Sequence, residues 1–272
     1  MKKAHLQILL TNDDGIESPG LWAAAAELSA IGYVTVVAPR DQASATGRSM
    51  PSTSDGAIIP THLRVKEQDW TVYSVGGTPA QVVQHGILEI MTCRPDLVVA
   101  GINYGENLGQ SITISGTIGA AMEAAAFGIP ALAVSLQLLE QAHFSNYERL
   151  DFSAAAYFTH YFAQRILDYG LPGDTNLLKV EVPASATPGT PWRITSLAKH
   201  RYYQPEGTRR EAWSDKSSIT FHSHVNPSDV FPDSDIKAVL FDQAVSVTPL
   251  TLDMTARVNL EEMNRQWHNG RY

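Results

Sequence analysis

The sequence is poor in cysteine and in clustered positive charge. Its single cysteine, Cys93, excludes an internal disulfide bond and fits a cytoplasmic location. Twenty Lys and Arg residues against twenty-eight Asp and Glu residues give a formal net charge of −8. Because binding to nucleic acid or to anionic lipid relies on clustered positive charge, we expect neither kind of partner.

The chain also lacks a long uninterrupted apolar run. The most apolar long stretch, residues 118–134, is broken by Glu123, Gly128 and Pro130, so we expect no membrane span. The start Met1-Lys2-Lys3 leads into a segment too short and too soon acidic for a signal peptide. These features together predict a cytoplasmic protein.

Two common nucleotide-binding motifs are absent from the Gly-rich stretch Gly101–Gly109. It lacks the Lys-Ser/Thr ending of a P-loop and the G-x-G-x-x-G spacing of a dinucleotide-binding loop. The sequence therefore supports neither an ATPase nor a dehydrogenase.

Short apolar strands alternate with helical segments through the first two thirds of the chain, which is typical of an α/β protein with parallel strands. We predict strands over 8–11, 34–38, 96–100 and 131–135, a strand pair over 61–75, and helices over 21–31, 79–91, 117–127 and 151–168. The expected fold is Rossmann-like and doubly wound, with a mainly parallel sheet.

The character of the chain changes beyond Gly173, where apolar segments alternate with polar loops. We predict strands over 177–182, 192–197, 217–222 and 236–247 and a helix over 258–267. We expect a single domain over 1–272, with a catalytic core at 1–172 and an antiparallel C-terminal extension at 173–272. The charged segment Arg201–Asp215 is predicted to form a projecting arm that pairs with another subunit.

Oxygen-bearing side chains follow several of the predicted parallel strands. They are Asp13, Asp14, Ser44 and Asn103, and the carboxyl ends of parallel strands meet at one edge of a sheet. Oxygen ligands favour Mg²⁺ or a similar divalent cation. Taken alone, Asn12-Asp13-Asp14-Gly15 is equally compatible with a polar turn, Ser44 with a solvated loop, and Asn103 with a turn.

A helix start lies nearby in the predicted fold. The free N–H groups of Ser115, Gly116 and Thr117 would form an anion site for phosphate, although Ser115 is also a plain N-cap residue. Asn107 could donate its side-chain amide to the same phosphate.

The ordered motifs resemble those of the SurE (survival protein E) family over nearly the whole chain. The matching segments are Ile8–Gly15 with Pro19-Gly20, Val37-Ala38-Pro39, Ser44, Gly76–Ala80, Gly101-Ile102-Asn103, Asn107-Leu108-Gly109, Ser115-Gly116-Thr117, Ala121-Met122-Glu123 and Ser246–Leu250.

The resemblance implies a metal-dependent phosphatase acting on nucleoside 5′-monophosphates, and also on 3′-monophosphates. It implies one divalent cation per subunit, Mg²⁺ or Mn²⁺, held by Asp13, Asp14, Ser44 and Asn103. Phosphate contacts would come from Asn107 and the Ser115–Thr117 turn. The assembly implied is a homodimer or homotetramer that exchanges C-terminal elements.

Three positions depart from the family pattern: Ala45 replaces a common Gly, and Gln81 and Val82 replace Asp and Cys. The predicted metal ligands are unchanged. We expect the loss of the carboxylate at position 81 to affect the choice of base or sugar more than catalysis.

Our mechanistic hypothesis is that the cation activates a water for in-line attack on phosphorus, with Asp13 or Asp14 assisting proton removal. Covalent attack by an Asp is disfavoured because the Asp-x-Asp pattern of haloacid-dehalogenase-like phosphatases is absent. A non-catalytic nucleotide or metal sensor using the same pocket is the alternative.

For several other side chains, the sequence is compatible with two interpretations. His222 and His224 would share one face of a strand and could bind metal, although surface positions are the commoner case. Tyr104, Tyr202 and Tyr203 could stack on a base or pack at an interface. Glu123 would face either the cation or solvent.

Overall fold

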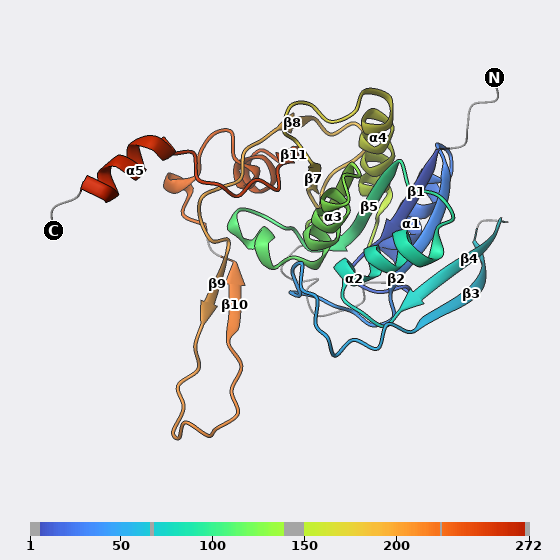
Figure 1. The fold of residues 1–272 in the computed structure, drawn as a ribbon, viewed down its shortest axis with the longest axis horizontal. Helices are drawn as coiled ribbons and strands as arrows, with labels where there is room; N and C mark the ends of the chain where they lie inside the picture. Colours follow the sequence, from blue (N-terminus) through green and yellow to red (C-terminus); the bar gives the residue numbers. More distant parts are fainter. Residues whose placement is uncertain (1–5, 66–67, 139–149, 224, 270–272) are drawn as a thin grey trace.

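The computed structural model describes residues 6–65, 68–138, 150–223 and 225–269. Within these residues, one nine-stranded sheet runs in the order β3-β4-β2-β1-β5-β6-β7-β11-β8, with helices on both of its faces (Figure 1). The strands of this sheet are β1 (Gln7–Thr11), β2 (Tyr33–Pro39), β3 (Ile58–Val65), β4 (Gln68–Val75), β5 (Leu97–Tyr104), β6 (Ala131–Leu136), β7 (Leu177–Val182), β8 (Trp192–Ile194) and β11 (Val245–Leu250). The helices are α1 (Pro19–Leu28), α2 (Pro79–His85), α3 (Gly116–Ala126), α4 (Ser153–Tyr169) and α5 (Leu260–Asn269).

The order of the parallel strands reverses at β1. This strand pairs in parallel with β2 on one side and with β5 on the other. The sheet then continues outward through β4 in one direction and through β6 and β7 in the other. The predicted doubly wound α/β fold is confirmed, and such a reversal is where open α/β sheets place their ligands.

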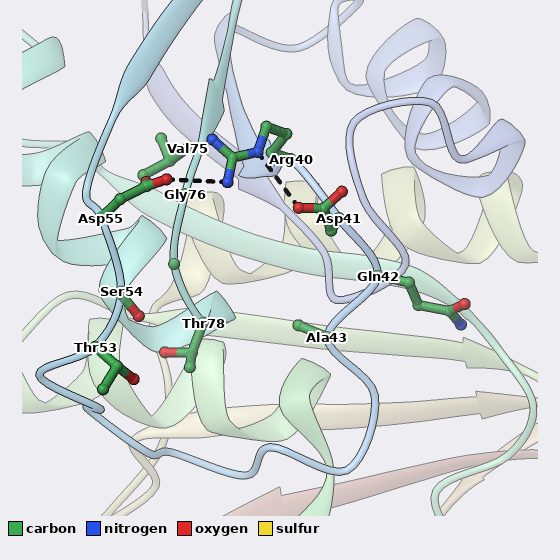
Figure 2. A pocket seen from close by; sticks show the side chains of 11 residues that line it. Arg40, Asp41, Gln42, Ala43, Thr53, Ser54, Asp55, Val75, Gly76 and Thr78 are labelled. Atoms are coloured by element: carbon green, nitrogen blue, oxygen red, sulfur yellow. Dashed lines mark hydrogen bonds and ion pairs between the residues drawn. The ribbon is translucent and has the colours of Figure 1, made fainter.

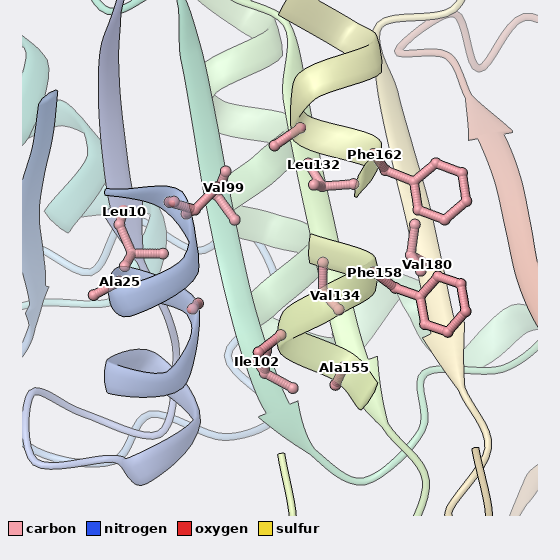
Figure 3. Packing of buried hydrophobic residues seen from close by; sticks show 14 of the residues in the cluster. Leu10, Ala25, Val99, Ile102, Leu132, Val134, Ala155, Phe158, Phe162 and Val180 are labelled. Carbon is pink, nitrogen blue, oxygen red and sulfur yellow. The ribbon is translucent and has the colours of Figure 1, made fainter. Parts of the chain in front are cut away.

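The core lies on both faces of the sheet, which explains why the central strands are continuously apolar. On one face, α1 and α4 pack against the strands, and Phe158 and Phe162 of α4 lie beside Val180 (Figure 3). On the other face, α2 and α3 cover a second cluster that includes Leu9 and Val98. Every residue of β6 is buried.

Several predicted elements differ from the structure. The strands predicted over 192–197 and 217–222 extend only over Trp192–Ile194 and Thr220–Ser223. The predicted strand over 236–247 is wrong in its first half, because Lys237–Phe241 forms a π-helical turn and β11 begins only at Val245. Gln243 between them has a φ of 48°, which ends the turn before the strand. The predicted helix over 79–91 ends at His85 and continues as a π-helical turn over Gly86–Ile90.

The C-terminal part joins the main sheet. Strand β7 pairs in parallel with β6, β11 pairs antiparallel with β7, and β8 pairs in parallel with β11. The expected boundary near residue 172 therefore falls between α4 and β7, inside one continuous sheet. Within the main sheet, the antiparallel arrangement that the sequence predicted for this region is present in the β7–β11 pair, whereas the β6–β7 and β8–β11 pairs are parallel.

A two-stranded antiparallel ribbon, β9 (Tyr203–Glu206) with β10 (Thr220–Ser223), projects from the body of the molecule (Figure 1). The predicted arm is thus present, and helix α5 extends away from the body near the C-terminus (Figure 1). None of the helices in the described part of the chain is both long enough and apolar enough to cross a membrane.

The packing of α4 yields a stability prediction. Phe158 is 2% exposed between α4 and the sheet, so Phe158→Ala should lower the free energy of unfolding by about 3–5 kcal/mol, measured by urea denaturation. Tyr169→Ala is the control on the same helix, because Tyr169 is 79% exposed and should change stability by less than about 0.5 kcal/mol. Equal losses in the two variants would contradict this picture of the core.

Candidate active site

The predicted site residues gather at the carboxyl ends of β1 and β5, where the strand order reverses. Asp13 and Asp14 follow β1 after Asn12, and Asn103 is the last residue but one of β5. The pairing of β5 with β6 shifts register between Ala100 and Asn103. Beyond this shift, Asn103 still pairs with Ser135 of β6.

Asp13 lies against the first turn of α3. It is 4% exposed, and its two oxygens accept hydrogen bonds from the Thr117 backbone N–H at 3.1 Å and the Thr117 hydroxyl at 2.7 Å. A Cβ on Gly116 would lie 2.8 Å from the Asp13 Cβ. A residue without a side chain is therefore required where the helix begins.

Asp14 connects the other two predicted ligands. Its Oδ2 accepts a hydrogen bond from the Tyr104 backbone N–H at 3.2 Å, next to Asn103. Its Oδ1 accepts one from the Gln42 side-chain amide at 3.4 Å, and the same amide nitrogen donates to Ser44 Oγ at 3.1 Å. The structure thus brings Asp13, Asp14, Ser44 and Asn103 together.

Asn103 is oriented by its own amide group. The side-chain nitrogen donates to the backbone carbonyls of Tyr104 at 3.3 Å and Gly105 at 2.7 Å. The side-chain oxygen is therefore the atom of Asn103 available to a cation.

The two aspartates create an electrostatic problem that a cation would solve. Burial raises the pKa of Asp13, although hydrogen bonds from Thr117 act against this rise. Burial and then the charge of Asp13 raise the pKa of Asp14 to about 8. The side chains that donate to these carboxylates, Thr117 and Gln42, are neutral, so no protein cation offsets the paired negative charge in these contacts.

The donor set fits a hard divalent cation. Two carboxylates, one hydroxyl and one amide oxygen are ligands that Mg²⁺ and Mn²⁺ accept. Among the described residues, no group of three or more His, Cys, Asp or Glu side chains is arranged to hold a metal. A cation at this site would therefore rely on Ser44 and Asn103 in addition to the two aspartates.

The predicted phosphate-binding turn already has intramolecular partners. Ser115 is the N-cap of α3, and its Oγ accepts from the Ile118 N–H at 3.2 Å. Thr117 donates to Asp13, as described above. Asn107 donates its side-chain amide to Ser135 Oγ at 3.0 Å, which uses one of its two amide hydrogens. The roles of these residues in phosphate binding stay predictions.

A cavity of about 280 Å³ lies beside the loop that carries Ser44 (Figure 2). It is lined by residues 40–43, 53–55 and 75–78. Arg40 crosses it and forms ion pairs with Asp41 at 3.3 Å and Asp55 at 3.1 Å. The Ala57 N–H and then Arg40 hold the pKa of Asp55 below its usual range. Gln42 lines the cavity and also contacts Asp14, so it links the cavity to the site.

The sequence did not identify Gln42 or Arg40. The only signal was their position in the long loop that also carries Ser44. Gln81, where a carboxylate was expected to matter for the nucleoside, instead caps α2: its Oε1 accepts from the Thr78 N–H at 3.1 Å and the Ser54 hydroxyl at 2.7 Å. Gln81 does not itself line the cavity, but Ser54 and Thr78, which it contacts, do.

Glu123 contacts neither of the partners considered for it. It is 4% exposed and pairs with Arg48 at 2.7 Å and with the Gln84 amide at 2.9 Å. These contacts tie the loop that carries Ser44 to α3 and α2.

The aromatic and histidine candidates also have structural partners. The Tyr104 hydroxyl accepts from Ser18 Oγ at 2.9 Å. Tyr202 and Tyr203 donate to Glu106, through its side chain and its carbonyl. His222 lies exposed on β10, with its Nδ1 3.9 Å from Glu206, and His224 lies outside the described residues.

Comparison with known proteins shows that both the sequence and the fold of this chain are similar to those of SurE proteins. The family model described as survival protein SurE matches residues 8–204. A protein of Methanocella arvoryzae named 5′-nucleotidase SurE is 40% identical over 95% of this chain and 97% of its own length. One from Thermococcus gammatolerans with the same name is 40% identical over 95% of this chain and 94% of its own. The crystal structure of the SurE protein from Aquifex aeolicus matches with a TM-score of 0.74 and 31% identity, over 97% of this chain and 99% of that one.

The loop that carries Ser44 yields a second prediction. Ala45 has a φ of 57°, a conformation in which Gly has no Cβ clash. Ala45→Gly should therefore raise the free energy of unfolding by about 1 kcal/mol, measured by urea denaturation. The neighbouring Ala43→Gly, without a positive φ, should lower it by about 0.5–1 kcal/mol. A loss of stability in Ala45→Gly would contradict the left-handed conformation.

Proposed function

This chain belongs to the SurE family, and we propose that it is a metal-dependent phosphatase that hydrolyses nucleoside 5′-monophosphates to nucleoside and phosphate. The observation that carries the proposal is the meeting of two adjacent buried carboxylates with Ser44 and Asn103 at the reversal of the strand order. The shared name 5′-nucleotidase of its relatives supports the substrate class.

Asp13, Asp14, Ser44 and Asn103 would hold the cation. When bound, a divalent ion supplies positive charge that offsets the paired carboxylates and polarises a phosphoryl oxygen. Either Mg²⁺ or Mn²⁺ suits these donors, and we propose that one ion binds per subunit.

The two aspartates differ in the way they are held. Both oxygens of Asp13 accept hydrogen bonds from Thr117, which fixes its carboxylate. Asp14 is held by the Tyr104 N–H and by a longer contact to Gln42. Because the Gln42 amide can move away from Asp14, Asp14 is the better candidate to accept the proton of the attacking water.

The phosphate would contact the tip of α3 and the second amide hydrogen of Asn107. The cavity lined by Arg40, Gln42 and Thr78 would receive the nucleoside, since Gln42 also contacts Asp14 (Figure 2). The resemblance of the sequence to the family also implies hydrolysis of 3′-monophosphates, which is part of the proposal.

We also propose that the subunits assemble as a homodimer or homotetramer through the C-terminal elements. The ribbon and α5 expose large apolar side chains, among them Trp213, Phe221, Leu260 and Trp267, which are between 60% and 95% exposed. Exposed apolar surface of this kind typically marks an interface. The mass of the particle in solution, measured by light scattering, tests this assembly.

Activity on a substrate panel tests the proposed function. Phosphate release from AMP, GMP, CMP and UMP, as 5′- and 3′-monophosphates, should require Mg²⁺ or Mn²⁺ and should stop on addition of EDTA. Nucleotide binding without release in any condition would instead support a sensor.

The aspartates provide the matching mutational prediction. Asp13→Asn and Asp14→Asn should each lower kcat/KM for AMP by at least about 10³-fold, because each removes negative charge that holds the cation. Asp168→Asn, a surface carboxylate that pairs with Gln164 on α4, should keep the full rate. Circular dichroism would establish that all three variants are folded, and undiminished rates in both site variants would refute the proposal.

A further inference from the structure

A cluster of buried charged side chains lies behind the loop that links β5 to α3. Lys179, Glu181 and Asp235 are each 0% exposed. The Lys179 ammonium lies 2.9 Å from Asp235 Oδ2 and 3.6 Å from Glu181 Oε1. None of these residues is among the predicted ligands of the cation or the phosphate.

Two members of the cluster, Lys179 and Glu181, form hydrogen bonds with the backbone of Asn107. Lys179 and Glu181 are two positions apart on β7, so their side chains leave the same face of the strand. Lys179 Nζ donates to the Asn107 carbonyl at 2.9 Å, and Glu181 Oε2 accepts from the Asn107 N–H at 2.9 Å. Both backbone polar groups of Asn107 are therefore held from β7.

The neighbouring loop residues are held in the same way. Asp235 Oδ2 accepts from the Gly109 N–H at 2.9 Å. The Glu106 carboxylate accepts from the Tyr202 hydroxyl at 2.6 Å and from the Leu138 N–H at 3.2 Å. The segment from Glu106 to Gly109 is thus fixed by side chains from distant parts of the chain.

The two carboxyl groups of the cluster differ in their interaction with Lys179. Burial opposes ionisation of Asp235, but the Lys179 charge and hydrogen bonds hold its pKa below the usual value. Burial raises the pKa of Glu181 to about 8, although Lys179 acts against this rise. Asp235 is therefore the closer ion-pair partner of Lys179, and Glu181 accepts the Asn107 N–H.

Stability alone does not account for such a cluster. Desolvation of each buried ion costs several kcal/mol, and replacing a buried ion pair by apolar side chains is often neutral or stabilising. Glu106 and Leu108 of this loop are buried, so the backbone groups there need partners within the protein. What the cluster adds is a fixed position for Asn107, whose side chain also donates to Ser135 on β6.

We propose that Glu181 and Lys179 are positioning residues that hold Asn107 so that its side-chain amide reaches the phosphate of the substrate. This inference rests on the proposed function. The two residues do not touch the substrate and act through Asn107.

Substitution of Glu181 separates positioning from simple stability. Glu181→Met removes the acceptor of the Asn107 N–H without removing a full charge, and it should lower kcat/KM for AMP by about 10- to 100-fold. Glu181→Gln keeps a side-chain oxygen for that N–H and should recover most of the rate. The control is Val180→Ala on the opposite face of β7, in the core with α4, which should lose stability with an unchanged rate.

A double-mutant cycle with Asn107→Ala tests the route of the effect. If Glu181 acts through Asn107, Glu181→Met should cause less than about a 3-fold further loss in the Asn107→Ala background. An equal fold-loss in both backgrounds, or an undiminished rate in the single variant, would overturn the proposal. Should Glu181→Met fail to fold, the double variant Lys179→Met with Asp235→Leu removes the ion pair without leaving a lone charge, and the same cycle and the same criteria apply.

Hydrogen exchange distinguishes failure of this inference from failure of the proposed function. If the wild-type protein released no phosphate from any nucleotide, the proposed function would fail. Amide exchange in a peptide covering residues 105–109 would still decide the positioning. It should become at least about 10-fold faster in Glu181→Met and stay unchanged in Val180→Ala, since local opening controls exchange, and equal exchange in both variants would overturn the positioning role.

Discussion

The site is organised around the repulsion between two adjacent carboxylates buried at the end of one strand. Asp13 and Asp14 cannot both be ionised at low cost in this position, which is expressed in the raised pKa values of both. Among the described residues, the hydrogen-bond donors to them are neutral and come from α3, from the end of β5 and from the loop after β2. A bound cation would offset this paired charge, and that is the basis of the function proposed above.

Close packing of helices against the strand ends makes this arrangement possible. Gly116 lets the tip of α3 reach Asp13. On the opposite face of the sheet, a Cβ on Gly20 would lie 2.4 Å from the Ile102 carbonyl, so α1 can lie against β5 just before Asn103. Two helices on opposite faces thereby fix the two strand ends that carry the ligands, because interiors packed this closely leave little room for movement.

The C-terminal part of the chain supports the site through side chains that contact the loop between β5 and α3. Strand β7 extends the parallel sheet and carries Lys179 and Glu181 to the loop at Asn107. Asp235 and Tyr202 reach the same loop from still later segments. The region that the sequence marked as an extension is therefore part of the support of the loop between β5 and α3, and the projecting ribbon starts next to Tyr202.

The sequence by itself determined the α/β fold and the doubly wound order, because apolar strands buried on both faces are local patterns, and it indicated Asp13, Asp14, Ser44 and Asn103 as candidates from their positions after predicted strands. It did not place β11 correctly, since a π-helical turn and a strand have similar apolar content over a few residues. Only the tertiary structure decided that Thr117 holds Asp13, that Gln42 bridges Asp14 and Ser44, and that Lys179 and Glu181 hold Asn107. These contacts join residues far apart in the chain, and their partners are fixed by the packing of whole elements and not by any pattern within a segment.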